Sequence, residues 1–295
     1  MKRITLIAPL LATLAFGAQA QESPTLKKIK DSASITLGHR ESSIPFSYYD
    51  DKQQVIGYSH ELMLKVVDSV KAELKLPKLD IRLMPVTSAN RITLVQNGTV
   101  DIECGSTTNN KERQKQVAFS NSIFVVGTRL LVKQSSGLKD FPDLAGKNVV
   151  TTAGTTSERL IRKMNEEKKL GMNVISAKDH GESFLTLESG RAVAFMMDDA
   201  LLYGEMAKAR KPADWIVTGT AQSKEAYGCM LRKDDPGFKK VVDAALAKAM
   251  TSGEAAKIHA KWFMNPIPPK GLNLNMPLSD DMKALLKAPN DQAFE

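Results

Sequence analysis

Apolar residues recur along the first hundred positions in two patterns, one short and continuous and the other with helical spacing. In the stretch 58–76, Leu62, Val66 and Val70 are spaced to share one face of a helix. The short apolar runs around it are typical of strands. Strands are predicted over residues 34–38, 80–86 and 100–104, and helices over 58–76 and 89–96. Because strand and helix alternate, the pattern predicts a parallel sheet with crossover helices.

A second alternating unit follows a long, β-rich apolar run at 123–132, which has the pattern of a strand that leaves the first unit. Its strands are predicted over 148–151, 173–176 and 193–197, and its helices over 157–169, 183–190 and 199–209. The strand-like segment 225–232 is predicted to return the chain to the first unit, where helices follow over 238–250 and 254–263. The chain therefore has the pattern of an α/β protein with two units joined by two crossings.

Two such crossings predict two lobes connected by a hinge, each lobe a mostly parallel sheet flanked by helices. We expect lobe 1 to be discontinuous, with residues 22–127 and 229–295, and lobe 2 to be the inserted segment 128–228. The polar segment 21–30 is predicted to fray. The segment from Asn265, rich in Pro and Lys, is predicted to wrap the surface.

The first twenty residues have the pattern of a cleaved secretory signal peptide. Lys2 and Arg3 precede an apolar run at 4–16, and Ala18 and Ala20 supply small residues for cleavage after Ala20. An uncleaved anchor is the alternative, but the run is short for a bilayer. We therefore expect an exported chain, in which 275 of the 295 residues remain after cleavage.

The charge of the chain suggests a small acidic ligand more than a nucleic acid. Its formal net charge is +8, or +6 without the first twenty residues, which hold two basic residues and no acidic one. The basic residues are spread among acidic ones, and aromatic residues make up only 6%. Such a distribution favours solubility or the steering of small anions.

Cys104 and Cys229 are the two cysteines of the chain. In an exported protein an even pair predicts a disulfide, and the alternative is two reduced buried thiols. Their separation of 125 residues excludes a CxxC redox or zinc pattern. His39, His60 and His259 have no metal-ligand spacing, and no nucleotide or dinucleotide glycine motif is present, so we expect neither a metal nor a cofactor.

The turn after the third predicted strand carries the clearest chemistry. Its sequence is Gly105-Ser106-Thr107-Thr108-Asn109-Asn110-Lys111-Glu112-Arg113. Such a turn offers backbone N–H groups, hydroxyl groups and one guanidinium, which together can hold a carboxylate. A turn that only caps a helix has a similar composition, so this alternative stays open.

Further motifs accompany this turn. They are Gly38-His39-Arg40-Glu41-Ser42-Ser43-Ile44-Pro45-Phe46-Ser47-Tyr48-Tyr49-Asp50, Ser88-Ala89-Asn90-Arg91, Gly154-Thr155-Thr156-Ser157, Ala177-Lys178-Asp179-His180-Gly181 and Ala194-Phe195-Met196-Met197-Asp198-Asp199. With the segment 226–236, they resemble the glutamate/aspartate-binding proteins of bacterial ABC amino-acid importers, within solute-binding protein family 3. The resemblance spans nearly the whole chain after the signal peptide.

The resemblance implies a type II periplasmic binding protein fold. It also implies a periplasmic protein that captures L-glutamate and L-aspartate in an interlobe cleft, does no chemistry on them, and delivers them to a membrane ABC permease. We expect a monomer that does not bind nucleic acid.

The resemblance also supports a set of ligand-binding residues. Arg113 is expected to bind the α-carboxylate, with Ser106 and Thr108 as further donors, although Arg113 as a surface arginine is an alternative. Asp198 is expected to bind the α-ammonium, because it ends an apolar strand of an open sheet. The alternative is that Asp198 caps the next helix, for which Asp199 is the better candidate.

The side-chain carboxylate is assigned by the resemblance to Arg40, Ser88, Arg91 and His180. A lone histidine is more often structural, so His180 depends on the resemblance. Thr156 follows Gly154 at the start of a predicted helix, where free N–H groups suit an anion. An ordinary N-cap at Thr156 is equally compatible with this position.

Two other functions remain open. The same fold can host a periplasmic cyclohexadienyl dehydratase, in which His180 or Glu41 would act as acid or base, although the sequence shows no nucleophile–base pair. A binding protein that docks on a receptor ectodomain would use the same pocket.

Overall fold

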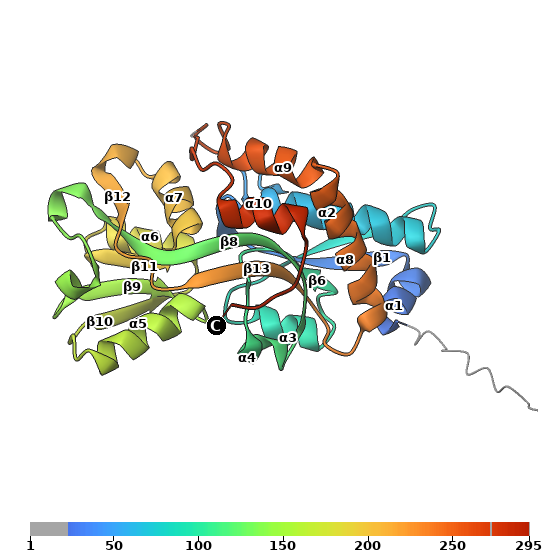
Figure 1. Cartoon of the computed structure of the whole chain (residues 1–295), viewed down its shortest axis with the longest axis horizontal. Coiled ribbons are helices and arrows are strands. Elements are labelled where there is room, and N and C mark those ends of the chain that lie inside the picture. The colour runs from blue at the N-terminus through green and yellow to red at the C-terminus, as the bar shows by residue number, and fades with distance from the viewer. Residues whose placement is uncertain (1–22, 272, 295) are drawn as a thin grey trace, which may run out of the picture.

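The computed structural model describes residues 23–271 and 273–294. The predicted signal peptide lies outside the described residues. Two α/β lobes lie side by side, and the long strands β8 (Ala118–Lys133) and β13 (Lys224–Leu231) run from one into the other (Figure 1). The predicted two-lobe α/β fold, with mostly parallel sheets flanked by helices and two crossings, is confirmed.

Lobe 1 contains a parallel sheet in the order β6-β1-β5. The strand β13 pairs with β6 in antiparallel orientation. Its strands are β1 (Ser34–His39), β5 (Asp80–Pro85), β6 (Ile102–Glu103) and β7 (Thr108–Asn109), and a small antiparallel sheet holds β2 (Ser42–Ser43), β3 (Ser47–Tyr49) and β4 (Val55–Ile56). Its helices are α1 (Pro24–Ser32), α2 (Tyr58–Glu73), α3 (Arg91–Gln96), α4 (Lys111–Gln114), α8 (Pro236–Thr251), α9 (Glu254–Phe263) and α10 (Asp280–Lys287). The predicted helix face of Leu62, Val66 and Val70 is fully buried.

Lobe 2 contains a parallel sheet in the order β10-β9-β11, with β8 antiparallel beside β11 and β12 paired to β8. Its strands are β9 (Asn148–Thr152), β10 (Asn173–Ala177), β11 (Ala194–Asp198) and β12 (Trp215–Thr218). Its α-helices are α5 (Thr156–Glu167), α6 (His180–Glu188) and α7 (Asp199–Lys208), and its short 3₁₀ helices are Gln134–Ser136, Phe141–Leu144 and Pro212–Asp214.

The two crossing strands pair with each other in antiparallel orientation. Residues 118–127 of β8 pair with β13, and residues 128–133 pair with β11 or β12 of lobe 2. The lobe boundaries expected from the sequence, after Gly127 and before Cys229, fall inside these strands. We propose that 22–127 with 229–295, and 128–228, are the two parts that move about this pair.

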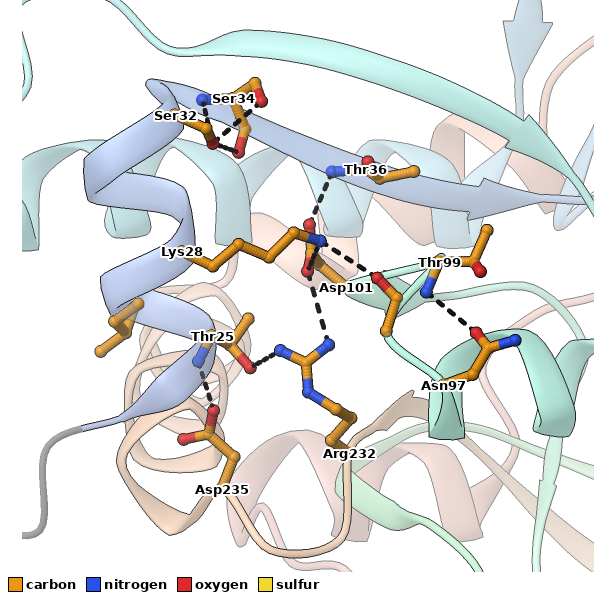
Figure 2. Close-up of polar contacts among 12 residues, drawn as sticks. Thr25, Lys28, Ser32, Ser34, Thr36, Asn97, Thr99, Asp101, Arg232 and Asp235 are labelled. Atoms are coloured by element: carbon orange, nitrogen blue, oxygen red, sulfur yellow. Dashed lines mark hydrogen bonds and ion pairs between the residues drawn. The ribbon is translucent and has the colours of Figure 1, made fainter.

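The start of the described chain does not fray, so that prediction was wrong. Ser23 caps α1, and Asp235 accepts a hydrogen bond from the Thr25 amide at 2.8 Å. Lys28 forms an ion pair of 2.8 Å with Asp101, whose carboxylate also accepts from the Thr36 amide at 2.9 Å (Figure 2). The polar segment that forms α1 is therefore held in place by buried carboxylates from distant parts of the chain.

The segment after Asn265 does more than wrap the surface, because it contains α10, which was not predicted from the sequence. Met282, Leu285 and Leu286 of this helix are buried, and α10 packs against α8 and β8. The tail then follows the crossing strands, where the Ser122 amide donates to the Asn290 carbonyl at 2.8 Å. The apolar residues of α10 have helical spacing, but the pattern is short, and the frequent Pro and Lys residues of this segment made it difficult to identify from the sequence.

Cys104 and Cys229 form the predicted disulfide, which joins the end of β6 to β13. Both side chains are fully buried. The bridge holds the Gly105–Arg113 turn beside the crossing strand. In the described part of the chain, none of the helices combines the length and the apolar character needed to cross a membrane.

Candidate functional site

The lobes touch each other at positions where glycine allows a close approach. A Cβ atom on Gly204 of α7 would lie 2.1 Å from the carbonyl oxygen of Ile44 in lobe 1. Gly154, whose φ is +76°, faces the backbone of Ala89, and its carbonyl accepts from Arg113 Nη2 at 3.2 Å. The structure therefore has the two lobes closed against each other, with the site between them.

Three arginines of lobe 1 are buried in the site: Arg40, Arg91 and Arg113 are only 1–2% exposed. Burial, and then the positive charge of Arg91, lower the pKa of Arg40 to about 10 and that of Arg113 to about 9. Burial also lowers the pKa of Arg91. All three guanidiniums remain charged at neutral pH, so their mutual repulsion favours an anion among them.

Arg113 lies on α4, which Asn110 caps by accepting from the Arg113 amide at 2.9 Å. Its Nη1 donates to the Thr108 carbonyl at 2.9 Å. The interpretation of Arg113 as a surface arginine is therefore wrong. The turn does cap a helix, through Asn110. Capping does not explain why the guanidinium of Arg113 is buried.

Several donors of the predicted residues are buried without a hydrogen-bond partner among the described residues. They are Ser88 Oγ, Arg91 Nε, Arg113 Nε and His180 Nε2. Because buried polar atoms are nearly always paired, such a group of unpaired donors is typical of a site for a polar ligand. These atoms come from both lobes.

His180 begins α6 and is 1% exposed. Its Nδ1 lies 2.9 Å from Thr152 Oγ1, while Nε2 stays unpaired. Burial, followed by the charges of Arg40 and Arg91, holds the pKa of His180 well below its usual value. The imidazole is therefore neutral, and it lies close enough to both arginines for their charges to lower its pKa.

Ser106 connects these arginines through the turn. Arg40 Nη1 donates to Ser106 Oγ at 3.5 Å, and Arg91 Nη1 donates to the Ser106 carbonyl at 3.2 Å. Arg91 also donates to Thr107 Oγ1 at 2.6 Å. Eight of the nine predicted residues, all but Ser88, are thus linked by hydrogen bonds or by mutual electrostatic effects: Arg40, Arg91, Ser106, Thr108, Arg113, Thr156, His180 and Asp198.

Asp198 ends β11 and is 3% exposed. Its carboxylate accepts hydrogen bonds from the hydroxyls of Tyr227, Thr128 and Ser157, at 2.5, 3.2 and 3.3 Å. Asp198 occupies the N-cap position of α7 but makes no capping hydrogen bond, while Asp199 accepts from the Ala200 amide at 2.7 Å. Capping therefore does not explain Asp198.

Burial raises the pKa of Asp198 to about 7, and the negative charge of Glu225 contributes in the same direction. Two buried carboxylates thus lie near each other, and the charges of both act on Arg91 and Arg113. A cation such as an ammonium would stabilise both in their ionised forms.

Thr156 is the first residue of α5, whereas its neighbour Thr155 is the N-cap and accepts from the Glu158 amide at 3.0 Å. The interpretation of Thr156 as an ordinary N-cap is therefore wrong. Its hydroxyl instead donates to Glu225 at 2.8 Å and lies 3.5 Å from Thr108 Oγ1 of the other lobe.

Four further buried polar residues around this site were not predicted from the sequence: Glu103, Thr107, Glu225 and Tyr227. Glu103 accepts from Thr107 Oγ1 at 2.7 Å, which in turn accepts from Arg91. A signal for the two acids was present, because each is a charged residue within an apolar strand. Within residues 23–271 and 273–294, no cluster of three or more His, Cys, Asp or Glu side chains is suited to a metal ion.

Known proteins share this sequence and fold. The L-glutamate/L-aspartate-binding protein of Pseudomonas aeruginosa is 64% identical over 98% of this chain and 99% of its own. The glutamate/aspartate import solute-binding protein of Salmonella typhimurium is also 64% identical, over 96% of this chain and 94% of its own. The solved structure of an ancestral arginine-binding protein bound to arginine is 27% identical, has a TM-score of 0.71, and covers 78% of this chain and 98% of its own.

A family model described as bacterial extracellular solute-binding proteins, family 3, matches residues 35–265. This match spans both lobes and both crossing strands. The chain belongs to the bacterial extracellular solute-binding proteins of family 3.

Proposed function

We propose that this protein is a periplasmic solute-binding protein that captures L-glutamate and L-aspartate between its lobes and delivers them to a membrane ABC permease. One observation carries the choice of ligand: three buried arginines and a neutral histidine are accompanied by a buried aspartate whose charge acts on Arg91 and Arg113. The names of the two relatives at 64% identity support the same choice.

The charges of the site match those of an acidic amino acid, which has two carboxylates and one ammonium. Burying such a ligand costs several kcal/mol per charge unless each charge is paired and hydrogen-bonded. Arg113 would bind the α-carboxylate together with donors of Ser106, Thr108 and Thr156. Asp198 would bind the α-ammonium.

The side-chain carboxylate would lie against Arg40, Ser88, Arg91 and His180. The unpaired Ser88 Oγ, Arg91 Nε and His180 Nε2 supply donors for it. A ligand held by both lobes binds the closed form better than the open form, and so shifts the hinge equilibrium toward closure. The closed monomer would then be the form that the permease recognises.

Calorimetric titration of ligand-stripped protein with the common amino acids tests this function. We expect L-glutamate and L-aspartate to bind with dissociation constants near micromolar or tighter, about −8 kcal/mol, and neutral amino acids far more weakly. Tighter binding of a neutral or basic amino acid would contradict the proposal.

Arg91→Ala is expected to weaken binding of L-glutamate and L-aspartate by roughly 10²-fold, because one charge-assisted contact to the side-chain carboxylate is lost. Binding of L-glutamine, which is neutral at that end, should change much less. Calorimetry on both ligands checks this. An unchanged ratio of the two affinities would reject the role of Arg91.

Gly204→Ala tests closure without touching the ligand-binding residues. Alanine favours helices over glycine by ~1 kcal/mol, so α7 itself should not be destabilised. The added Cβ would meet the Ile44 carbonyl at 2.1 Å when the lobes close. We expect L-glutamate affinity to fall at least ~10-fold, while the free energy of urea unfolding of the free protein does not fall. Wild-type affinity in this variant would show that closure does not need this contact.

A dehydratase on the same fold is the alternative function. The names of the two relatives describe binding and import, and neither describes an enzyme. Of the two residues proposed as acid or base for that alternative, Glu41 lies on the exposed surface, and His180 is assigned above to the side-chain carboxylate. Incubation with arogenate or prephenate should therefore give no turnover.

A further inference from the structure

Glu225 lies where the two lobes meet the crossing strands, and none of the ligand contacts proposed above includes it. It belongs to β13 and is 6% exposed. Its Oε2 accepts hydrogen bonds from Thr108 of lobe 1 and from Thr156 of lobe 2. Its Oε1 accepts from Ser223 Oγ at 3.1 Å. One carboxylate oxygen therefore joins the hydroxyls of two expected ligand-binding residues from opposite lobes.

These hydrogen bonds decide what the two threonines can offer to a ligand. An ionised carboxylate only accepts hydrogen bonds, and a hydroxyl has a single proton to donate. With both protons directed at Glu225, neither hydroxyl can donate to a ligand carboxylate. The backbone N–H groups of Thr108 and Thr156 remain as donors, and the hydroxyl oxygens can accept from an ammonium.

Glu225 also adds charge next to Asp198. Thr128 Oγ1 lies 3.2 Å from the Asp198 carboxylate and 3.5 Å from that of Glu225. Across the described ranges, neither acid forms an ion pair with a lysine or arginine. The two acids thus make a buried negative region, which suits an ammonium group.

We propose that Glu225 selects for the α-amino group of the ligand, by orienting the Thr108 and Thr156 hydroxyls as acceptors and by adding negative charge beside Asp198. The inference rests on the proposed function. It predicts discrimination between an acidic amino acid and the same dicarboxylic acid without its amine. L-glutamate and glutarate form such a pair, since they differ only in the α-ammonium.

The test measures the affinity of the Glu225→Gln variant for L-glutamate and for glutarate. The affinity for glutarate is obtained from its displacement of bound L-glutamate. In the wild type, glutarate should bind at least ~100-fold more weakly than L-glutamate. In Glu225→Gln, the affinity for L-glutamate should fall ~10–100-fold, whereas the affinity for glutarate should fall less than ~3-fold. A loss of L-glutamate affinity below ~3-fold, or equal losses for both ligands, would overturn the inference.

Thr156→Val is a second variant, useful if Glu225→Gln does not fold. It removes one hydroxyl but keeps the backbone N–H and the carboxylate. If the hydroxyl is committed to Glu225, glutarate binding should stay within ~3-fold while L-glutamate weakens. If the hydroxyl donates to the ligand carboxylate instead, both ligands weaken equally, and the inference is wrong.

Glu254→Gln is the matched control, because it makes the same chemical change at an exposed ion pair with Lys65, outside the site. Its affinities should equal those of the wild type. Failure of the proposed function would appear separately, as an absence of L-glutamate and L-aspartate binding to the wild-type protein.

Discussion

Replacing Arg113 by alanine is expected to remove most of the affinity for both L-glutamate and L-aspartate. Hydrogen bonds to charged groups contribute about 1.5–3 kcal/mol each, so losing a two-bond contact to the α-carboxylate would cost roughly 3–6 kcal/mol, or about 10²–10⁴-fold in affinity. The loss is large because the guanidinium is 2% exposed, and water cannot easily replace it. Calorimetric titration of the variant with each amino acid measures the effect.

Two further variants serve as controls for Arg113→Ala. One preserves the positive charge at position 113, and the other removes an arginine outside the site. Arg113→Lys keeps the positive charge but lacks the planar fork, so it should recover only part of the affinity. Arg82→Ala removes an exposed arginine of the edge strand β5 and should bind as the wild type does. If Arg113→Ala bound L-glutamate within ~10-fold of the wild type, the assignment of the α-carboxylate would be wrong.

Removing the disulfide with Cys104→Ala and Cys229→Ala together should lower the free energy of unfolding more than any of the site substitutions. The bridge closes a loop of 125 residues, and the chain-entropy model gives on the order of 4–5 kcal/mol for a loop of that length. For a protein of this size, the melting temperature should fall by roughly 10 °C. Urea unfolding and calorimetric melting of the free protein check both values.

Reduction of the wild type provides the control for this prediction. A thiol reductant strong enough to open the bridge should lower wild-type stability to that of the double variant, and should leave the double variant unchanged. An unfolding free energy within ~1 kcal/mol of the wild type would show that the bridge does not constrain the unfolded chain as the model requires.

The alternation of strands and helices was readable in the sequence because each element depends on local periodicity. The buried face of Leu62, Val66 and Val70 and the two crossing strands followed from spacing alone. The resemblance to a known family pointed to the ligand-binding residues, and the structure gathers the three arginines, His180 and Asp198 in buried positions between the lobes. Short elements with a polar or proline-rich sequence, such as α1 and α10, could not be predicted, since distant residues such as Asp101 and Asp235 hold α1 in place.

What the sequence by itself determined is the fold class, the cysteine pair and the types of side chain available for an acidic ligand. Only the tertiary structure decided how these side chains are used. Thr108, Thr156 and Glu225 are separated by up to 117 residues along the chain, yet they share hydrogen bonds at the hinge. The direction of a hydroxyl proton, and the burial that leaves His180 neutral and raises the pKa of Asp198, depend on neighbours that only folding brings together.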